Sequence, residues 1–279
     1  LNNGYGFCGQ TAGFLGADYD PWHVIKDPNS KNFHVKELEF RPGLSVGRMT
    51  ERRRLLQSID AQRETLAGSQ QVRDLSRRMQ QAHNILVDGR MRDSFDIARE
   101  TDETRDRYGR HMFGQSMLLA RRLVESEMPI VQVNVGHMNR WDTHGNNFGH
   151  LKSHLPLWDT GISALIQDIY ARGLDQDVTV CVWDEFGRTP KINKNAGRDH
   201  WAPVNYALLA GGGMKTGQMI GTTDKTGGHA ATRPVHYRDV LSTLYHNLGI
   251  DSHDVVRDVG ERPMPILHAH AAPIRELVG

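Results

Sequence analysis

Cysteine is scarce in this sequence, which has only Cys8 and Cys181 among its 279 residues. So few thiols exclude a disulfide scaffold and a cysteine-based zinc module. Long hydrophobic runs are also lacking, since no stretch approaches the ~18 consecutive apolar residues that a membrane-spanning helix needs. Nor does one sign of charge dominate. The 34 Lys and Arg residues nearly cancel the 33 Asp and Glu residues, so the net charge of +1 gives no reason to expect nucleic acid or an anionic membrane as a partner.

Histidine and arginine, by contrast, are plentiful. The chain has 15 histidines, and 26 of its 34 basic residues are Arg. Histidine is the commonest metal ligand, so the composition already raises the hypothesis of a metal site. Hydrophobic residues make up 38% of the chain, which is enough for a sizeable core.

The opening stretch LNNGYGFCGQTAGFLGADYDPWHV begins at Leu1, without a preceding Met. It has no positively charged start and no apolar central run, so it is not a signal peptide. Its glycines are typical of a loop within a fold. We therefore expect this chain to be a portion of a longer protein.

Residues 1–110 are predicted to form a Gly-rich loop region followed by a helical subdomain. Residues 1–45 are rich in Gly, Pro, Asn and Asp, which favours loop structure. Apolar residues then recur at helical spacing over 50–66, 72–89 and 94–109. These segments carry many charges, so we expect them to be peripheral helices.

Residues 111–279 alternate between helical and strand patterns. Helices are predicted at 114–127, 155–174 and 233–250, and β-rich strands at 129–135, 177–183 and within 204–213. Such alternation with apolar strands predicts an α/β fold, in which a mostly parallel sheet is sandwiched by helices. In such sheets, ligands bind beyond the carboxyl ends of the strands.

Three polar clusters lie in loops that follow or lead to these strands. They are GHMNRWDTHGNN at 136–147 with His137, Asp142 and His144, DEFGRTP at 184–190 with Asp184, Glu185 and Arg188, and GRDHW at 197–201 with Arg198, Asp199 and His200. Each cluster also has a structural explanation. Asp142 could form an Asx turn, Glu185 an ion pair within a turn, and Asp199 a helix cap or the partner of Arg198.

Carboxylates and imidazoles that converge from several loops suit a divalent ion such as zinc, manganese, iron or calcium. The predicted metal ligands are Asp142, His144, Glu185, Asp199 and His200. A metal polarises a phosphoryl, sulfuryl or carbonyl oxygen and lowers the pKa of water that it binds. A nearby arginine, either Arg188 or Arg198, would hold an oxyanion through its fork of donors.

Several motifs taken together resemble one family. They are WDTH (141–144), EFGRTP (185–190), GRDHW (197–201), LAGGGMKTGQMIGTTD (209–224) and RDVLSTLYHNLGID (238–251). The sequence resembles the DUF1501 family, often labelled sulfatase-like, over essentially the whole chain. The resemblance implies the alkaline-phosphatase-like superfamily, an α/β sandwich with a two-metal site at the strand ends. It also implies export through a twin-arginine signal to the periplasm or beyond, and that this chain is the C-terminal portion of such a protein.

The resemblance also implies a ligand set. The middle Asp…His pair of the superfamily falls on Asp142 and His144, and the last histidine falls on His200. A later Asp-His pair falls on Glu185 and Phe186. Phenylalanine cannot bind a metal, so that ligand is absent or is supplied from elsewhere, as by Asp199.

The leading hypothesis is an exported metal-dependent hydrolase of phosphate or sulfate esters, with a small-molecule or glycan ester as substrate. The alternative is a non-catalytic member that binds anionic glycans or partner proteins at the cell envelope. A purely structural envelope protein would leave the three clusters unexplained. We expect the loops 136–147, 184–190 and 197–201 to meet, with their ligands within ~12 Å of one another. We also expect the chain by itself to lack the nucleophile, and so to bind metal weakly and to hydrolyse no ester.

Overall fold

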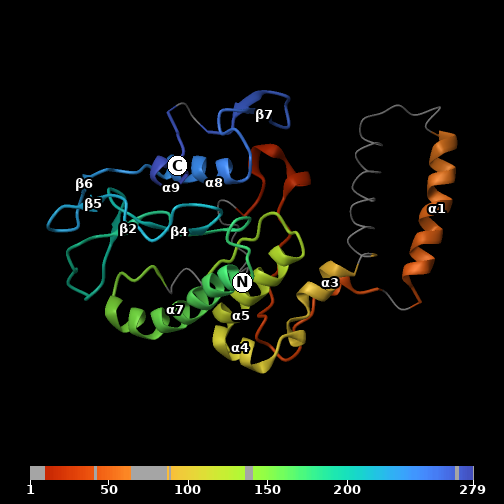
Figure 1. Cartoon of the computed structure of the whole chain (residues 1–279), viewed down its shortest axis with the longest axis horizontal. Coiled ribbons are helices and arrows are strands. Elements are labelled where there is room, and N and C mark those ends of the chain that lie inside the picture. The colour runs from red at the N-terminus through yellow and green to blue at the C-terminus, as the bar shows by residue number, and fades with distance from the viewer. Residues whose placement is uncertain are drawn as a thin grey trace.

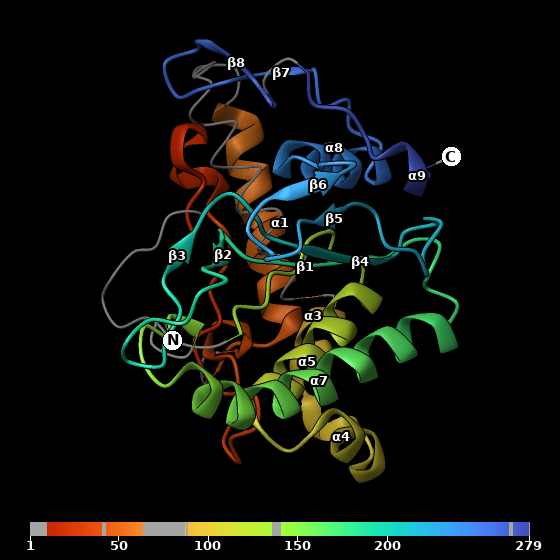
Figure 2. The ribbon, with the colours of Figure 1, turned by 90° about the vertical axis from the view of Figure 1, so that its left-hand side faces the viewer.

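A layer of short strands lies between two groups of helices in the computed structural model of the chain, which describes residues 10–40, 43–63, 87, 89–135, 141–267 and 270–278. Figures 1 and 2 both show β4 (Ala207–Gly211) between α8 (Tyr237–Asn247) on one side and α7 (Asn147–Ala171) on the other. None of the helices in these residues is long and apolar enough to cross a membrane.

The strand layer is centred on β1 (Thr179–Trp183), which pairs with β4 in an antiparallel ladder from Thr179↔Gly211 to Trp183↔Ala207. Successive strand residues point to opposite faces. Val180 and Val182 accordingly pack against the main core, and Cys181 packs against the smaller core under α8. Both faces of β1 are covered, which explains its nearly continuous apolar sequence.

The main core lies between the strands and a group of helices made of α3 (Arg90–Phe95), α4 (Asp102–Tyr108), α5 (Met112–Glu125) and α7. Its buried side chains include Phe95, Tyr108, Leu118 and Ile169. The backbones of α5 and α7 approach closely at Gly161, where an added Cβ would lie 3.2 Å from the Cα of Gly114. This core contains residues from both sides of residue 110, and the predicted division into two domains stays a prediction.

A buried ion network ties these helices together. The Arg121 side chain is 2% exposed and lies 2.9 Å from Glu100, 2.7 Å from Glu125 and 3.5 Å from Asp168. The Tyr108 hydroxyl donates to Asp168 at 2.8 Å, and burial together with this carboxylate raises the pKa of Tyr108. Such a network joins α4, α5 and α7 through charges that the surrounding core shields from water.

The second group of helices consists of α8 and α9 (Arg275–Val278), which cover the opposite face of the strands. A capping box formed by His236 and Asp239 begins α8, and the chain leaves the helix through Gly249 in the left-handed region. The remaining strand pairs are all antiparallel: β2 (Gly187–Arg188) with β3 (His200–Trp201), β5 (Thr222–Thr223) with β6 (Ala230–Thr232), and β7 (Val255–Arg257) with β8 (Pro263–Pro265).

The N-terminal part contains short helical turns and one long helix. The turns are η1 (Gly13–Leu15), η2 (Ala17–Tyr19), η3 (Lys36–Leu38) and, further on, η4 (Ile97–Arg99). The long helix, α1 (Val46–Arg63), lies to the right of the main body in Figure 1. Its predicted apolar face is exposed to solvent, since Leu55 is 64% and Leu56 is 41% exposed.

The helices expected at 114–127, 155–174 and 233–250 are confirmed by α5, α7 and α8. The helix expected over 94–109 is wrong as a single element, because the chain forms η4 and α4 instead. Asp96 accepts a hydrogen bond from Ala98 N and Thr101 from Thr104 N, so each side chain starts a separate turn. The helix expected at 72–89 lies largely outside the described residues.

The segment 129–135 does not form the strand expected there. From Val131 to Val135 its residues alternate between half-buried and exposed, as in a strand, and Val131 and Val135 pack against the main core. Within the described part of the chain, however, the segment pairs with no other strand. Every strand pair in the described residues is antiparallel. These pairs do not show the mostly parallel sheet that the sequence predicts, and that sheet stays a prediction.

Candidate metal centre

Two loops bring the candidate ligands together. Asp142 and His144 lie in the loop that leads into α7, and His200 lies in β3. The first loop turns into α7 at Asn146, whose φ of 45° is left-handed, a conformation that Asn tolerates better than most residues. Buried Thr143 donates to the Asn147 side chain at 2.5 Å, which fixes the loop between the two ligands.

The second loop is a short antiparallel hairpin of β2 and β3. Arg188 in β2 is the direct cross-strand partner of His200 in β3. Directly paired residues of an antiparallel ladder project their side chains on the same face. The ladder therefore places a guanidinium group and an imidazole side by side.

Backbone and side-chain hydrogen bonds join the two loops. Gly145 and Ala196 form an isolated antiparallel bridge, and Arg198 N donates to the carbonyl of Thr143 at 3.1 Å. The Asn193 side chain donates to the carbonyl of His144 at 3.0 Å. The positions of the ligand-bearing segments relative to each other are thus set by the backbone as well as by the ligands.

Asp142, His144 and His200, which we call the metal-binding group, form a possible metal-binding site. The Oδ1 atom of Asp142 lies 3.0 Å from His144 Nε2 and 2.8 Å from His200 Nε2, and the two Nε2 atoms are 3.2 Å apart. Ligands of one ion, each about 2.0–2.2 Å from it, lie roughly 3–3.5 Å from one another. The three atoms therefore have nearly the spacing of ligands that share an ion, and their side chains are 43–50% exposed to solvent.

Asp199 lies on the far side of His144. Its Oδ1 is 2.7 Å from His144 Nδ1 and also accepts from Asn193 at 3.1 Å. The hydrogen bonds from His144 and Asn193 lower the pKa of Asp199 below its ordinary value. An ionised carboxylate can only accept, so Nδ1 of His144 carries the hydrogen and Nε2 of the neutral ring is an acceptor.

His200 Nε2 contacts both acceptors, at 3.2 Å from His144 Nε2 and 2.8 Å from Asp142 Oδ1. Hydrogen bonds from His200 and Arg188 lower the pKa of Asp142 to about 2, so its carboxylate is ionised. Without a metal, a hydrogen on His200 Nε2 serves these acceptors. A metal ion would replace that hydrogen, with Asp142 Oδ1 and the two Nε2 atoms as its ligands. Two imidazoles and one carboxylate are a ligand set typical of zinc and of non-haem iron.

The structure brings together most of the predicted site residues, and Glu185 and Arg198 are the exceptions. Among the described residues, the atoms that converge on one point belong to Asp142, His144 and His200. The hydrogen bond with Asp184 and burial raise the pKa of Glu185, so this carboxyl is paired with another carboxylate and not with the imidazoles. Asp199 contacts a ligand and orients it. His137 lies outside the described residues.

The two predicted oxyanion-binding arginines have different positions. Arg188 donates to Asp142 Oδ1 at 2.6 Å and is thus at the metal-binding group. Arg198 donates to the backbone carbonyls of Thr189 at 2.7 Å and Arg188 at 3.0 Å. Its guanidinium group therefore supports the β2–β3 hairpin and is largely occupied by backbone.

Two residues next to the site, Phe186 and Asn193, were not predicted from the sequence to have a role in it. The ring of Phe186, expected only as a position without a ligand, packs on His200 with the ring centroids 4.4 Å apart. Asn193 bonds to both Asp199 and the backbone of His144. No motif marked Asn193, because its role depends on the contact between two loops that are distant in sequence.

Comparison with known proteins gives one family. A family model described as "Protein of unknown function (DUF1501)" matches residues 3–278. No curated protein and no solved structure matches the chain. The match spans the two loops of the metal-binding group and nearly all of the remaining sequence. The chain therefore belongs to the DUF1501 family.

Proposed function

We propose that the chain carries the metal centre of a hydrolase that acts on phosphate or sulfate esters. The observation that carries this proposal is the convergence of Asp142, His144 and His200 on one point, with Asp199 fixing the tautomer of His144. A carboxylate behind a ligating histidine is a recurrent support of metal sites, because it orients the ring and raises its basicity.

In this proposal, a bound divalent ion would polarise the ester and lower the pKa of an attacking water. Arg188 lies at the edge of the metal-binding group, and its N–H groups that contact neither Asp142 nor the backbone carbonyl of Arg198 would hold the remaining oxyanion charge. Among the described residues, the side chains that hydrogen-bond to the group or stack on it are Arg188, Asp199 and Phe186, none of which is a hydroxyl or thiol nucleophile. We therefore favour direct attack by water, with the ester oxygen leaving as an alcohol.

The resemblance to the alkaline-phosphatase-like superfamily supports an ester substrate. Its two-metal plan needs more ligands than the metal-binding group supplies, and Phe186 stands where a histidine would be expected. One ion is therefore the arrangement that we propose for these residues. Membership of that superfamily and export of the protein remain parts of the proposal.

The test combines metal analysis with an esterase panel. Because water is the proposed nucleophile, the purified chain by itself, loaded with zinc, manganese or iron, should bind one equivalent of ion and hydrolyse aryl phosphates or aryl sulfates. This outcome differs from the weak metal binding and absent hydrolysis expected from the sequence. His200→Ala should lose both properties. His253→Ala is the matched control, since His253 forms an exposed pair with Asp251 at 3.0 Å outside the metal-binding group. Failure of all three metals to bind to the wild-type chain would refute the proposal.

A second function is favoured by the contacts of Arg188 and Phe186. If Arg188 stays bonded to Asp142 and the Phe186 ring keeps covering one face of His200, the site has little room for a reacting ester. Such a centre would bind an anionic glycan or partner without chemistry. One equivalent of tightly bound metal with no turnover of any ester would favour this alternative over the hydrolase.

A further inference from the structure

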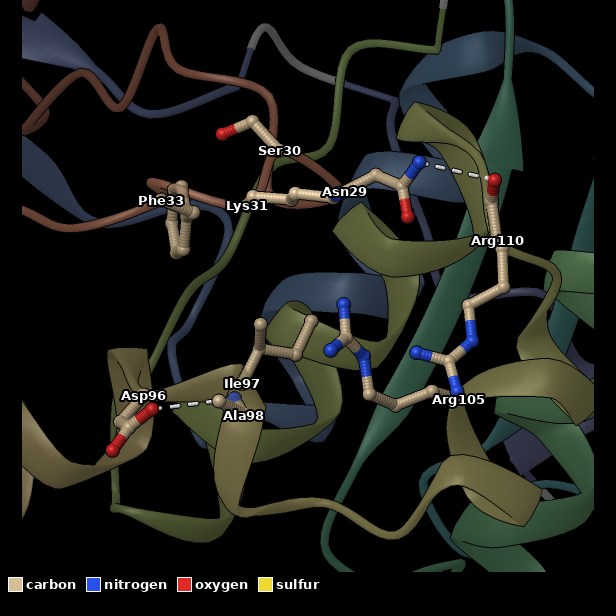
Figure 3. A pocket seen from close by; sticks show the side chains of 9 residues that line it. All are labelled: Asn29, Ser30, Lys31, Phe33, Asp96, Ile97, Ala98, Arg105 and Arg110. Atoms are coloured by element: carbon tan, nitrogen blue, oxygen red, sulfur yellow. Dashed lines mark hydrogen bonds between the residues drawn. The ribbon is translucent and has the colours of Figure 1, made fainter.

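A cavity of about 280 Å³ lies apart from the metal-binding group and shares no residue with it. Its wall comes from the loop around Lys31, from the turn around Ile97 and from Arg105 and Arg110 at the end of α4. Figure 3 shows the Arg105 guanidinium group reaching into the space that Asn29, Ile97 and Arg110 enclose. Sites for drug-sized ligands span roughly 300–1,000 Å³, so this one suits a ligand of about one ring.

Three basic side chains, Lys31, Arg105 and Arg110, line the cavity together with one carboxylate, that of Asp96. Arg110 is neutralised by Asp102 at 2.5 Å and by Asp106. Asp96 accepts a hydrogen bond from Ala98 N at 3.2 Å in its own turn. Within the described part of the chain, neither Lys31 nor Arg105 forms a salt bridge, although Asp102 lies close enough for the charge of Arg105 to lower its pKa.

A buried glutamine holds Arg105 in place. Gln115 is fully buried, and its Oε1 accepts from Arg105 Nε at 2.8 Å. The Gln115 amide group in turn donates to the carbonyls of Arg105 and Gly109, each at 2.9 Å. The orientation of the guanidinium group is therefore fixed from behind, while its two terminal amino groups stay outside this network. A fork of donors held in this way loses little entropy when it binds an anion.

The apolar part of the cavity wall consists of Phe33, Ile97 and Ala98, and the polar Asn29 and Ser30 also line it. Ile97 is 4% exposed, and Phe33 is half-buried against the main core. These side chains offer a surface for a ring or a short hydrocarbon, which would gain about 25 cal/mol for each Å² of apolar surface removed from water. The cavity thus combines positively charged donors with an apolar surface.

We propose that this cavity binds a small organic anion, whose carboxylate, sulfate or phosphate group pairs with Arg105 and Lys31 and whose apolar part lies on Phe33 and Ile97. The three anionic groups share the oxygen geometry that a guanidinium fork binds through two parallel hydrogen bonds. The site is separate from the proposed hydrolase centre. Binding of the anion is therefore expected to be independent of whether that centre holds a metal.

The test is isothermal titration of the whole chain with benzoate, phenyl sulfate and phenyl phosphate, in the presence of EDTA. We expect saturable binding of at least one of them at one site, and the strongest of the three identifies the anionic group. Arg105→Met should weaken binding about tenfold or more, because it removes charge-assisted hydrogen bonds and keeps the length of the side chain. Lys31→Gln, at an exposed position that tolerates substitution, should weaken binding several-fold.

Two controls separate this cavity from other anion sites. Lys225→Gln removes an exposed positive charge elsewhere and should leave binding unchanged. His200→Ala should also leave it unchanged, and a loss of binding in this variant would assign the anion to the metal-binding group and overturn the proposal. Absence of saturable binding by all three probes would overturn it as well, as would equal binding by the wild-type chain and the folded Lys31→Gln and Arg105→Met variants.

Discussion

The imidazole of His144 and the carboxylate of Asp199 are joined by a hydrogen bond, with Nδ1 and Oδ1 2.7 Å apart. Because this contact holds Nε2 of His144 toward Asp142, it predicts a contribution of Asp199 to metal affinity. Asp199→Asn should weaken zinc binding about 10–100-fold without abolishing it. Competition with a chromogenic zinc chelator measures the dissociation constants. Glu185→Gln, which alters a predicted ligand outside the metal-binding group, should keep the wild-type affinity, and an equal loss in both variants would contradict the assigned roles.

The close approach of the two loops at Gly197 gives a second prediction. A Cβ at this position would lie 2.0 Å from the backbone carbonyl of His144, so Gly197→Ala must displace the segment that carries a ligand. We expect a lower metal affinity together with a loss of stability of roughly 1–3 kcal/mol. Gly47→Ala in α1 is the control, since its Cβ would meet only Ser45 Oγ at 3.9 Å. Unchanged metal binding by Gly197→Ala would show that the loops adjust freely.

The buried network around Arg121 predicts a large effect on stability. Asp168→Ala removes the acceptor of Tyr108 and of Arg107 and leaves Arg121 with less compensation in the core. The free energy of unfolding should fall by about 3–5 kcal/mol, as is usual when one partner of a buried ion pair is removed. Asp159→Ala on the exposed side of the same helix should change it by less than about 0.5 kcal/mol. Urea denaturation of the two variants makes the comparison, and similar midpoints would contradict the prediction.

The loop between β5 and β6 predicts a dependence of stability on pH. Asp224 accepts from Gly228 N and from the Thr226 hydroxyl, and these hydrogen bonds lower its pKa from 3.8 to about 2. A carboxyl whose pKa is lower in the folded state stabilises the fold above its unfolded pKa, and this contribution disappears as the pH falls through the folded pKa. The stability difference between the wild-type chain and Asp224→Asn should therefore shrink as the pH falls from about 4 towards 2. Urea denaturation at several pH values measures the free energy of unfolding of both proteins. A difference between them that stays constant over this pH range would contradict the prediction.

The helices were predictable from the sequence because their signals are local. The spacing of apolar residues marked α5, α7 and α8, and Gly249 marked the end of the last of these. The direction of strand pairing is not a local property. The apolar pattern at 177–183 indicated a strand covered on both faces, which β1 is, but nothing in that pattern specified β4 as its antiparallel neighbour.

The same distinction holds for the candidate site. Asp142, His144 and His200 were predicted because chemically suitable residues follow or precede segments with a strand pattern, one of which, 129–135, does not form a strand. The role of Asp199 differs from the predicted one, since a carboxylate next to a histidine has the same sequence pattern whether it binds an ion or orients a ligand. Arg198 and Arg188 were equivalent in sequence, and only the folding of the hairpin turned one of them toward the backbone.

The two histidines of the metal-binding group are 56 positions apart, and α7 and β1 lie between them. An ion held by both would close a loop of that length, much as a crosslink does. If the ion stays bound to both histidines in the unfolded chain, this loop restricts the unfolded ensemble, by a few kcal/mol in chain-entropy models. A bound metal would then be a reversible crosslink between the start of α7 and the β2–β3 hairpin. Removing it with a chelator would therefore change the cooperativity of unfolding as well as the chemistry of the site.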